Sequence, residues 1–88
     1  MITIKRFRNI EQLQKVQRLA NESGEDVGIH SEDGSIIVDA KSFIGMFALD
    51  FTKPVKVVCE DMNFHKAIAN VGETVDFLPE FLKSEIYG

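Results

Sequence analysis

Cysteine, histidine and tryptophan are scarce in this sequence of 88 residues, which holds one cysteine, two histidines and no tryptophan. A single cysteine forms neither an internal disulfide nor a thiolate metal cluster, so we expect Cys59 to be a small buried hydrophobic residue in a reducing cytoplasm. Long apolar runs are also missing, and residues 1–6 lack a signal-peptide core, so we expect neither export nor a membrane span. The net charge of -4 argues against nucleic acid or an anionic membrane as a partner.

What is present is the composition of an ordinary globular protein, with 44% hydrophobic and 27% charged residues. A chain this short has room for one hydrophobic core, so we predict a single domain over residues 1–88 without a separate catalytic module. Residues 79–88 form a short tail, and we expect Phe81, Leu82 and Ile86 to dock it onto the domain.

The first residues carry the pattern of a strand. Ile2 and Ile4 lie on one side and Thr3 and Lys5 on the other, which is the period-two alternation of a half-buried strand over residues 2–6.

A helix is predicted to begin at Ile10, because Asn9 and Gln12 have the spacing of a capping box. Apolar residues at helical spacing follow and form one stripe. Gly24 can take the positive φ that ends many helices, so we expect the helix to stop there.

A hairpin is the clearest local signal. Two stretches with β-branched residues, 27–29 and 36–38, flank the turn pair Asp33-Gly34.

The second half of the chain predicts a helix, a strand and another helix. Ser42 caps a short helix that extends to about residue 49, and residues 55–59 form a strand. Apolar positions repeat every three or four residues over 63–78 and predict a third helix, with close packing at Gly72. The element order β-α-β-β-α-β-α indicates an α+β two-layer domain.

The helix that Ser42 caps has two separate apolar arcs. Met46 and Leu49 occupy one arc, and Phe43, Ile44 and Phe47 occupy the other. A helix that lies on a sheet cannot easily bury both. Either the helix is wedged into the core or covered by the tail, or one apolar patch is an exposed interaction surface.

Ser42 itself has two possible roles. Capping alone explains a serine at this position. A phosphorylation site is the alternative, because a phosphate at a helix N-terminus meets free amides and a favourable dipole, with Lys41 adjacent.

The remaining candidates for chemistry are weak. His30 on the polar side of a strand and His65 in the last helix have no carboxylate or cysteine at metal-ligand spacing, so we expect two solvated surface histidines and no metal. Lys5, Arg6 and Arg8 precede the first helix and form either a solvated basic cluster or an anion site with its N-terminus.

One stretch carries a resemblance to a known family. It reads Val38-Asp39-Ala40-Lys41-Ser42-Phe43-Ile44-Gly45-Met46-Phe47-Ala48-Leu49. It resembles the regulatory-serine segment of the histidine-containing phosphocarrier (HPr) family, whose members carry a Lys-Ser-aliphatic-Met/Phe-Gly run. Asp26-Val27, Asp33-Gly34, Val55-Lys56-Val57 and the final helix extend the resemblance over about residues 1–78.

The resemblance implies an open-faced two-layer sandwich, with a four-stranded antiparallel sheet and three helices on one face. It also implies a family that accepts phosphate from phosphoenolpyruvate, through Enzyme I, on a histidine in a Gly-Ile/Leu-His-Ala-Arg-Pro-Ala motif. Here the corresponding residues 7–12 place Asn9 at or near that position, without the histidine or the Arg-Pro pair. Because an amide cannot accept the phosphate as an imidazole does, the sequence predicts neither an enzyme nor a histidyl carrier.

The serine matches the family better. In Gram-positive relatives an ATP-dependent HPr kinase/phosphorylase modifies it, and the product binds a catabolite-control transcription regulator through the following helix. This chain is similar to the histidine-lacking variant, the catabolite-repression HPr-like protein. The resemblance implies that Ser42 is the modified residue and that Phe43, Ile44 and Phe47 contact the partner, although one extra residue lies between Gly34 and Lys41.

Two alternatives stay open. One is a phosphocarrier with an atypical site such as His65, and the other is a constitutive interaction module built on the apolar patch. For all three functions we expect no cofactor, a protein partner and a monomer or weak dimer.

Overall fold

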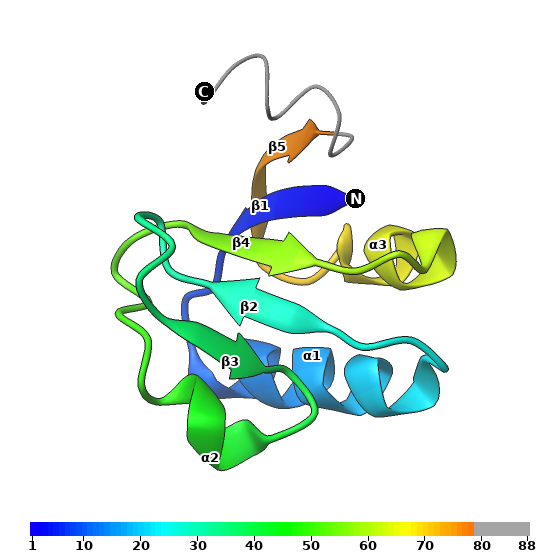
Figure 1. The fold of residues 1–88 in the computed structure, drawn as a ribbon, viewed down its shortest axis with the longest axis horizontal. Coiled ribbons are helices and arrows are strands. Elements are labelled where there is room, and N and C mark those ends of the chain that lie inside the picture. The colour runs from blue at the N-terminus through cyan, green and yellow to red at the C-terminus, as the bar shows by residue number, and fades with distance from the viewer. Residues whose placement is uncertain (79–88) are drawn as a thin grey trace.

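β1 (Ile2–Arg6) lies inside a five-stranded antiparallel sheet with the order β3-β2-β4-β1-β5 (Figure 1). The other strands are β2 (Gly28–His30), β3 (Ile37–Asp39), β4 (Val55–Val58) and β5 (Glu73–Leu78), and the helices are α1 (Ile10–Glu22), α2 (Phe43–Met46) and α3 (Met62–Ile68). The computed structural model describes residues 1–78, so the predicted docking of the tail through Phe81, Leu82 and Ile86 lies outside the described residues.

One core cluster joins the sheet to all three helices. Its sheet residues include Ile29, Val55 and Val57, which share one face because their strands pair directly in register. Its helical residues are Leu13, Val16 and Ala20 of α1, Met46 of α2, and Phe64 and Ile68 of α3. An α+β fold with an open antiparallel sheet and three helices is therefore confirmed, whereas the sheet has five strands and not the expected four.

Helix α1 begins where the sequence predicts. The Asn9 side chain accepts a hydrogen bond from the Gln12 amide at 2.9 Å, which caps the helix. The Gln12 side chain accepts from the backbone amide of Arg8 at 2.7 Å, one residue before the Asn9 amide that a capping box would use.

The glycine predictions have mixed outcomes. Gly24 does not take a positive φ, because Ser23 leaves α1 in an extended conformation and donates its amide to the last turn. Gly34 does have a positive φ, 77°, in the turn of the β2–β3 hairpin. Asp33 in that turn accepts hydrogen bonds from the Ser35 amide and hydroxyl and the Ser31 hydroxyl, and these bonds lower the pKa of Asp33 to about 2.

The prediction of a third helix over residues 63–78 is correct for its first half and wrong for its second half. Helix α3 ends at Ile68, and residues 73–78 form the edge strand β5, which pairs with β1. Gly72 lies in the turn between them with φ 70°, where a Cβ would come 2.7 Å from the Arg6 carbonyl oxygen. The predicted close packing at Gly72 is confirmed, but it occurs in a turn and not inside a helix.

Strand β1 points its polar residues toward the helices. Thr3 and Lys5 pair with Val57 and Val55 of the core, so these four side chains share the helix-facing side of the sheet. Both Thr3 and Lys5 are buried there. The isoleucines of β1 therefore lie on the opposite face of the sheet.

Cys59 is buried and has a free thiol, as predicted. No helix within residues 1–78 has the length and apolar character needed to cross a membrane.

Candidate functional site

Ser42 lies at the start of α2 with an exposed side chain. Its Oγ accepts a hydrogen bond from the Gly45 amide at 3.3 Å, which caps this single helical turn. The segment is anchored on both sides, because Gln17 of α1 donates to the Lys41 carbonyl and the Ser42 amide donates to the Asp39 carbonyl. The hydroxyl is therefore accessible at a fixed position beside β3 and α1.

The two apolar arcs of this segment have different surroundings, as the sequence predicts. Met46 and Leu49 are buried in the core. Ile44 is 83% exposed and Phe47 is 55% exposed. Phe43 is half-buried against the core and contacts Phe47 edge to face, with ring centroids 5.1 Å apart. Of the three predicted contact residues, Ile44 and Phe47 are thus accessible, and Phe43 mainly supports Phe47.

Exposed apolar side chains concentrate near this helix. Helix α2 lies next to β3, one of the two edge strands of the sheet (Figure 1). Of the seven large hydrophobic side chains that are exposed within residues 1–75, four belong to residues 36–47. They are Ile36, Ile37, Ile44 and Phe47, and we call this set the apolar edge. Clusters of exposed apolar side chains mark sites of contact with other proteins more often than isolated exposed apolar residues do.

Asn9 is exposed at the start of α1, and its side-chain oxygen caps the helix. A polar hollow of about 270 Å³ lies beside it, between α1 and residues 70–72. The described lining of this hollow contains amide, carboxylate and ammonium groups but no imidazole or thiol. The position therefore has a helix cap where the resembled family has its phosphate-accepting histidine.

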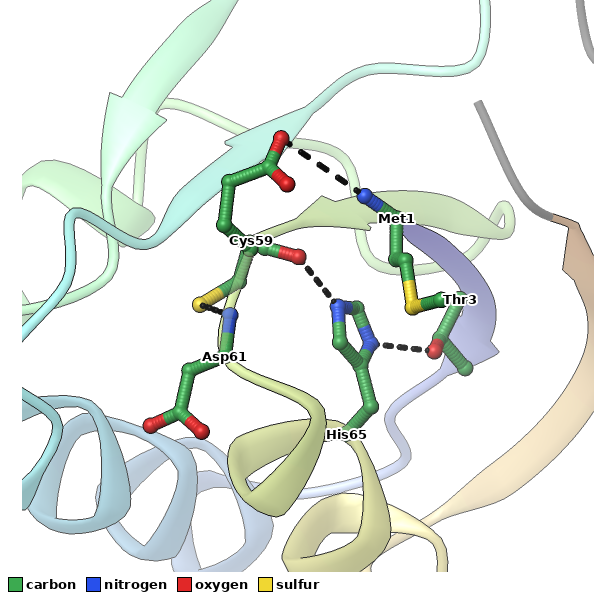
Figure 2. A network of polar contacts seen from close by, with 6 residues as sticks. Met1, Thr3, Cys59, Asp61 and His65 are labelled. Carbon is green, nitrogen blue, oxygen red and sulfur yellow. Dashed lines mark hydrogen bonds and ion pairs between the residues drawn. The ribbon is translucent and has the colours of Figure 1, made fainter. Parts of the chain in front are cut away.

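The prediction of a solvated His65 is wrong. His65 is buried, because α3 packs its first turns against β1 and the end of β4. Figure 2 shows its ring between two partners: Nδ1 lies 2.6 Å from Thr3 Oγ1, and Nε2 lies 2.7 Å from the Cys59 carbonyl oxygen. Because a carbonyl only accepts, Nε2 carries the proton, and Nδ1 accepts from the threonine hydroxyl in the neutral ring.

Burial lowers the pKa of His65, which favours this neutral form. Further polar contacts surround the ring in Figure 2: the Asp61 amide donates to Cys59 Sγ at 3.3 Å, and the N-terminal amine lies 4.0 Å from Glu60 Oε1. These contacts join β1, β4 and α3, so His65 has a structural role in the described residues.

His30 is half-buried on the face of the sheet opposite the helices. Its ring lies against Gly28, where a Cβ would come 3.2 Å from Nε2. Within residues 1–78 there is no group of three or more histidine, cysteine or carboxylate side chains that could hold a metal ion.

The basic residues before α1 do not form one site. Lys5 is fully buried, and its Nζ donates to Thr74 Oγ1 at 2.7 Å. Burial also lowers the pKa of Lys5. Arg8 forms an exposed ion pair with Glu73 at 2.9 Å. Neither an anion site nor a solvated cluster of Lys5, Arg6 and Arg8 is present, because β1 directs Lys5 and Arg6 to opposite faces of the sheet.

Sequence reasoning missed the buried pair Thr3–His65 and the partly buried pair Lys5–Thr74. Their members are 62 and 69 residues apart, and no local pattern links them. No family model, curated protein or solved structure matches this chain.

Proposed function

We propose that this chain is an HPr-like protein related to the sugar phosphotransferase system, and that it is a regulatory or binding protein that works through the Ser42 helix. It would not be a histidyl phosphocarrier, and it would not be an enzyme. The observation that carries the proposal is the exposure of Ile44 and Phe47 on the helical turn that an accessible Ser42 caps. The Lys41-Ser42 resemblance to the HPr regulatory segment supplies the kind of regulation.

Phosphorylation of Ser42 would change this surface directly. A phosphate adds about 1.5 to 2 negative charges and three strong acceptor oxygens. Its oxygens can accept from the Gly45 amide, as Oγ does in the unmodified protein, so the helical turn need not unfold. The new charge would stand beside Ile44 and Phe47, and a partner with a basic and apolar surface would then bind the modified protein more tightly.

A carrier function at His65 has little support. A phosphoryl acceptor must reach its donor, but this imidazole is buried and both ring nitrogens have close partners. Asn9 cannot replace it, because its amide is not a nucleophile of comparable strength.

A constitutive interaction module is the second candidate, favoured by the size of the apolar edge. Ile36 and Ile37, at the neighbouring strand β3, are also exposed, although Ile37 pairs with His30 and therefore points to the sheet face opposite the helices. A partner or a second copy that covers this surface would need no phosphate. Sedimentation over a range of concentrations would distinguish a weak dimer from a monomer.

Labelling with two phosphate donors tests the proposal. The protein is incubated with ATP and HPr kinase, and separately with phosphoenolpyruvate and Enzyme I, and the phosphate is located by mass spectrometry. We expect acid-stable phosphate at Ser42 from ATP only, and none in Ser42→Ala. Ser35→Ala, which removes an exposed serine of the hairpin turn, is the matched control and should be labelled like the wild type. Phosphohistidine from phosphoenolpyruvate would contradict the proposal, and absence of label from both donors would leave only the constitutive module.

A further inference from the structure

The sheet has a second face, opposite the one that packs on the helices. Successive side chains of a strand point to opposite faces, and β1 and β4 turn Thr3, Lys5, Val55 and Val57 toward the helices. The residues between them therefore point the other way. We call this surface the open face, and its residues on these two strands are Ile2, Ile4, Lys56 and Val58.

Ile2 is covered although it lies on the open face. Its side chain is 2% exposed, as little as the core, but it does not belong to the core cluster. Strand side chains stand roughly perpendicular to the sheet, so neighbouring strands cover their flanks and leave their tips exposed unless a second layer lies above them. Farther along the same face, Ile4 is half-buried and Ile37 is 64% exposed. The cover over the open face is therefore local and lies above the beginning of β1.

The chain leaves the sheet at this same place. Strand β5 is an edge strand, and its last residue, Leu78, pairs with Ile2. Proline at position 79 has no amide to donate, so it is unsuited to continue the pairing. The ten residues 79–88 can span up to about 33 Å when extended. Two strand spacings, from β5 across β1 to β4, amount to only about 10 Å, so this segment is long enough to reach Ile2 and Val58.

The helix side of the same edge does not have such a cover. Met62 and Ala69 of the α3 region lie near Thr74 of β5 on that side. Met62 is 37% exposed and Ala69 is also exposed. A segment packed there would bury both, so the burial of Ile2 favours the open face.

We propose that residues 79–88 fold back over the end of β5 and cover Ile2 and Val58 on the open face. The contacts would come from the three large aliphatic and phenyl side chains of the segment, Phe81, Leu82 and Ile86. The occupant is the chain itself and not a second copy, because a segment tethered at Leu78 has an effective concentration on the order of millimolar at this face. The proposal is independent of Ser42 and of the proposed regulatory function.

Nuclear Overhauser contacts in the full-length protein test the proposal. With methyl-labelled isoleucine and valine, we expect contacts from the Phe81 ring protons to the methyl groups of Ile2 and Val58. Leu82→Asp, which lies outside the described domain, should remove most of these contacts and shift both methyl signals, because it places a charge in the apolar contact. Ser84→Asp adds the same charge at a polar position of the segment and should keep the contacts.

Three results would overturn the proposal. One is the absence of contacts between residues 79–88 and the open face, or contacts that Leu82→Asp leaves unchanged. Another is a set of contacts to Met62 and Ala69 in their place, which would put the segment on the helix side. The third is a set of contacts that appears only between differently labelled copies in a mixed sample, which would make a second copy the occupant.

Discussion

The imidazole of His65 is the clearest case in which a residue's surroundings decide its chemistry. Thr3 and the Cys59 carbonyl bind its two nitrogens, and burial lowers its pKa below the ordinary value of 6.5. As the pH falls, His65 is therefore protonated in the unfolded chain at a higher pH than in the folded chain. The neutral ring contributes its full stability above pH 6.5, and this contribution decreases as the pH falls from 6.5 toward the lowered pKa.

We accordingly expect the free energy of unfolding to decrease with acidification below about pH 6.5. Urea unfolding of the wild type and of His65→Gln, measured from pH 5 to 7.5, checks this expectation. Glutamine keeps a donor and an acceptor but does not titrate, so its pH slope should be smaller. His30 and the carboxylates are present in both proteins and cancel in the comparison. Equal slopes would show that His65 does not titrate differently in the two states.

For single residues, the sequence predicted some hydrogen-bond partners and burial states and not others. Alternation in β1 indicates which side chains share a face, but it does not say which face the helices cover. The burial of Thr3 and Lys5 depends on His65 and Thr74, which lie far along the chain. The Asn9 cap could be predicted because its donor, the Gln12 amide, is only three residues away.

Elements with strong local signals were predicted correctly, and one element set by a distant partner was not. The β2–β3 hairpin follows from Asp33-Gly34, and α1 follows from its cap and apolar stripe. Val71, Val75 and Leu78 have a spacing that fits a helix equally well, but β1 presents an unpaired edge to residues 73–78. Backbone pairing with β1 therefore determines that residues 73–78 form a strand. Such pairing cannot be predicted from a short stretch of sequence.

Alanine substitutions at the three glycines of these turns should change the free energy of unfolding by graded amounts. Gly24→Ala should keep or raise the free energy of unfolding by up to about 1 kcal/mol, because its φ is not positive and no atom lies within 4 Å of the new Cβ. Gly34→Ala should cost about 1–2 kcal/mol, since its φ is 77° but its surroundings are open. Gly72→Ala should cost the most, because the Cβ also meets the Arg6 carbonyl at 2.7 Å and the Phe7 ring at 2.9 Å. Denaturant titrations measure the series, and equal costs at Gly34 and Gly72 would contradict the close packing.

At the scale of the whole molecule, the proposed function depends on the division of α2 between core and solvent. Ile44→Lys should change the free energy of unfolding by no more than about 0.5 kcal/mol, because its side chain is 83% exposed. Met46→Lys, two residues away, should cost more than about 3 kcal/mol, because it buries an unpaired charge. Chemical denaturation of the two variants checks this difference. Similar losses in both would mean that Ile44 is covered in solution.

The apolar edge was partly predictable, because two arcs on one short helix cannot both face a sheet. The partners of β1 were not, because the pairing with β5 and the contact of Thr3 with His65 join residues far apart in the chain.

Binding of a catabolite-control transcription regulator to the Ser42-phosphorylated and unmodified proteins tests the central proposal most directly. Surface plasmon resonance should show tighter binding of the phosphorylated protein, and Ile44→Lys should remove most of that binding. Ile10→Lys alters another exposed isoleucine, on α1, and should bind like the wild type. Equal binding by the phosphorylated wild type and its Ile44→Lys variant would contradict the assignment of this helix as the working surface.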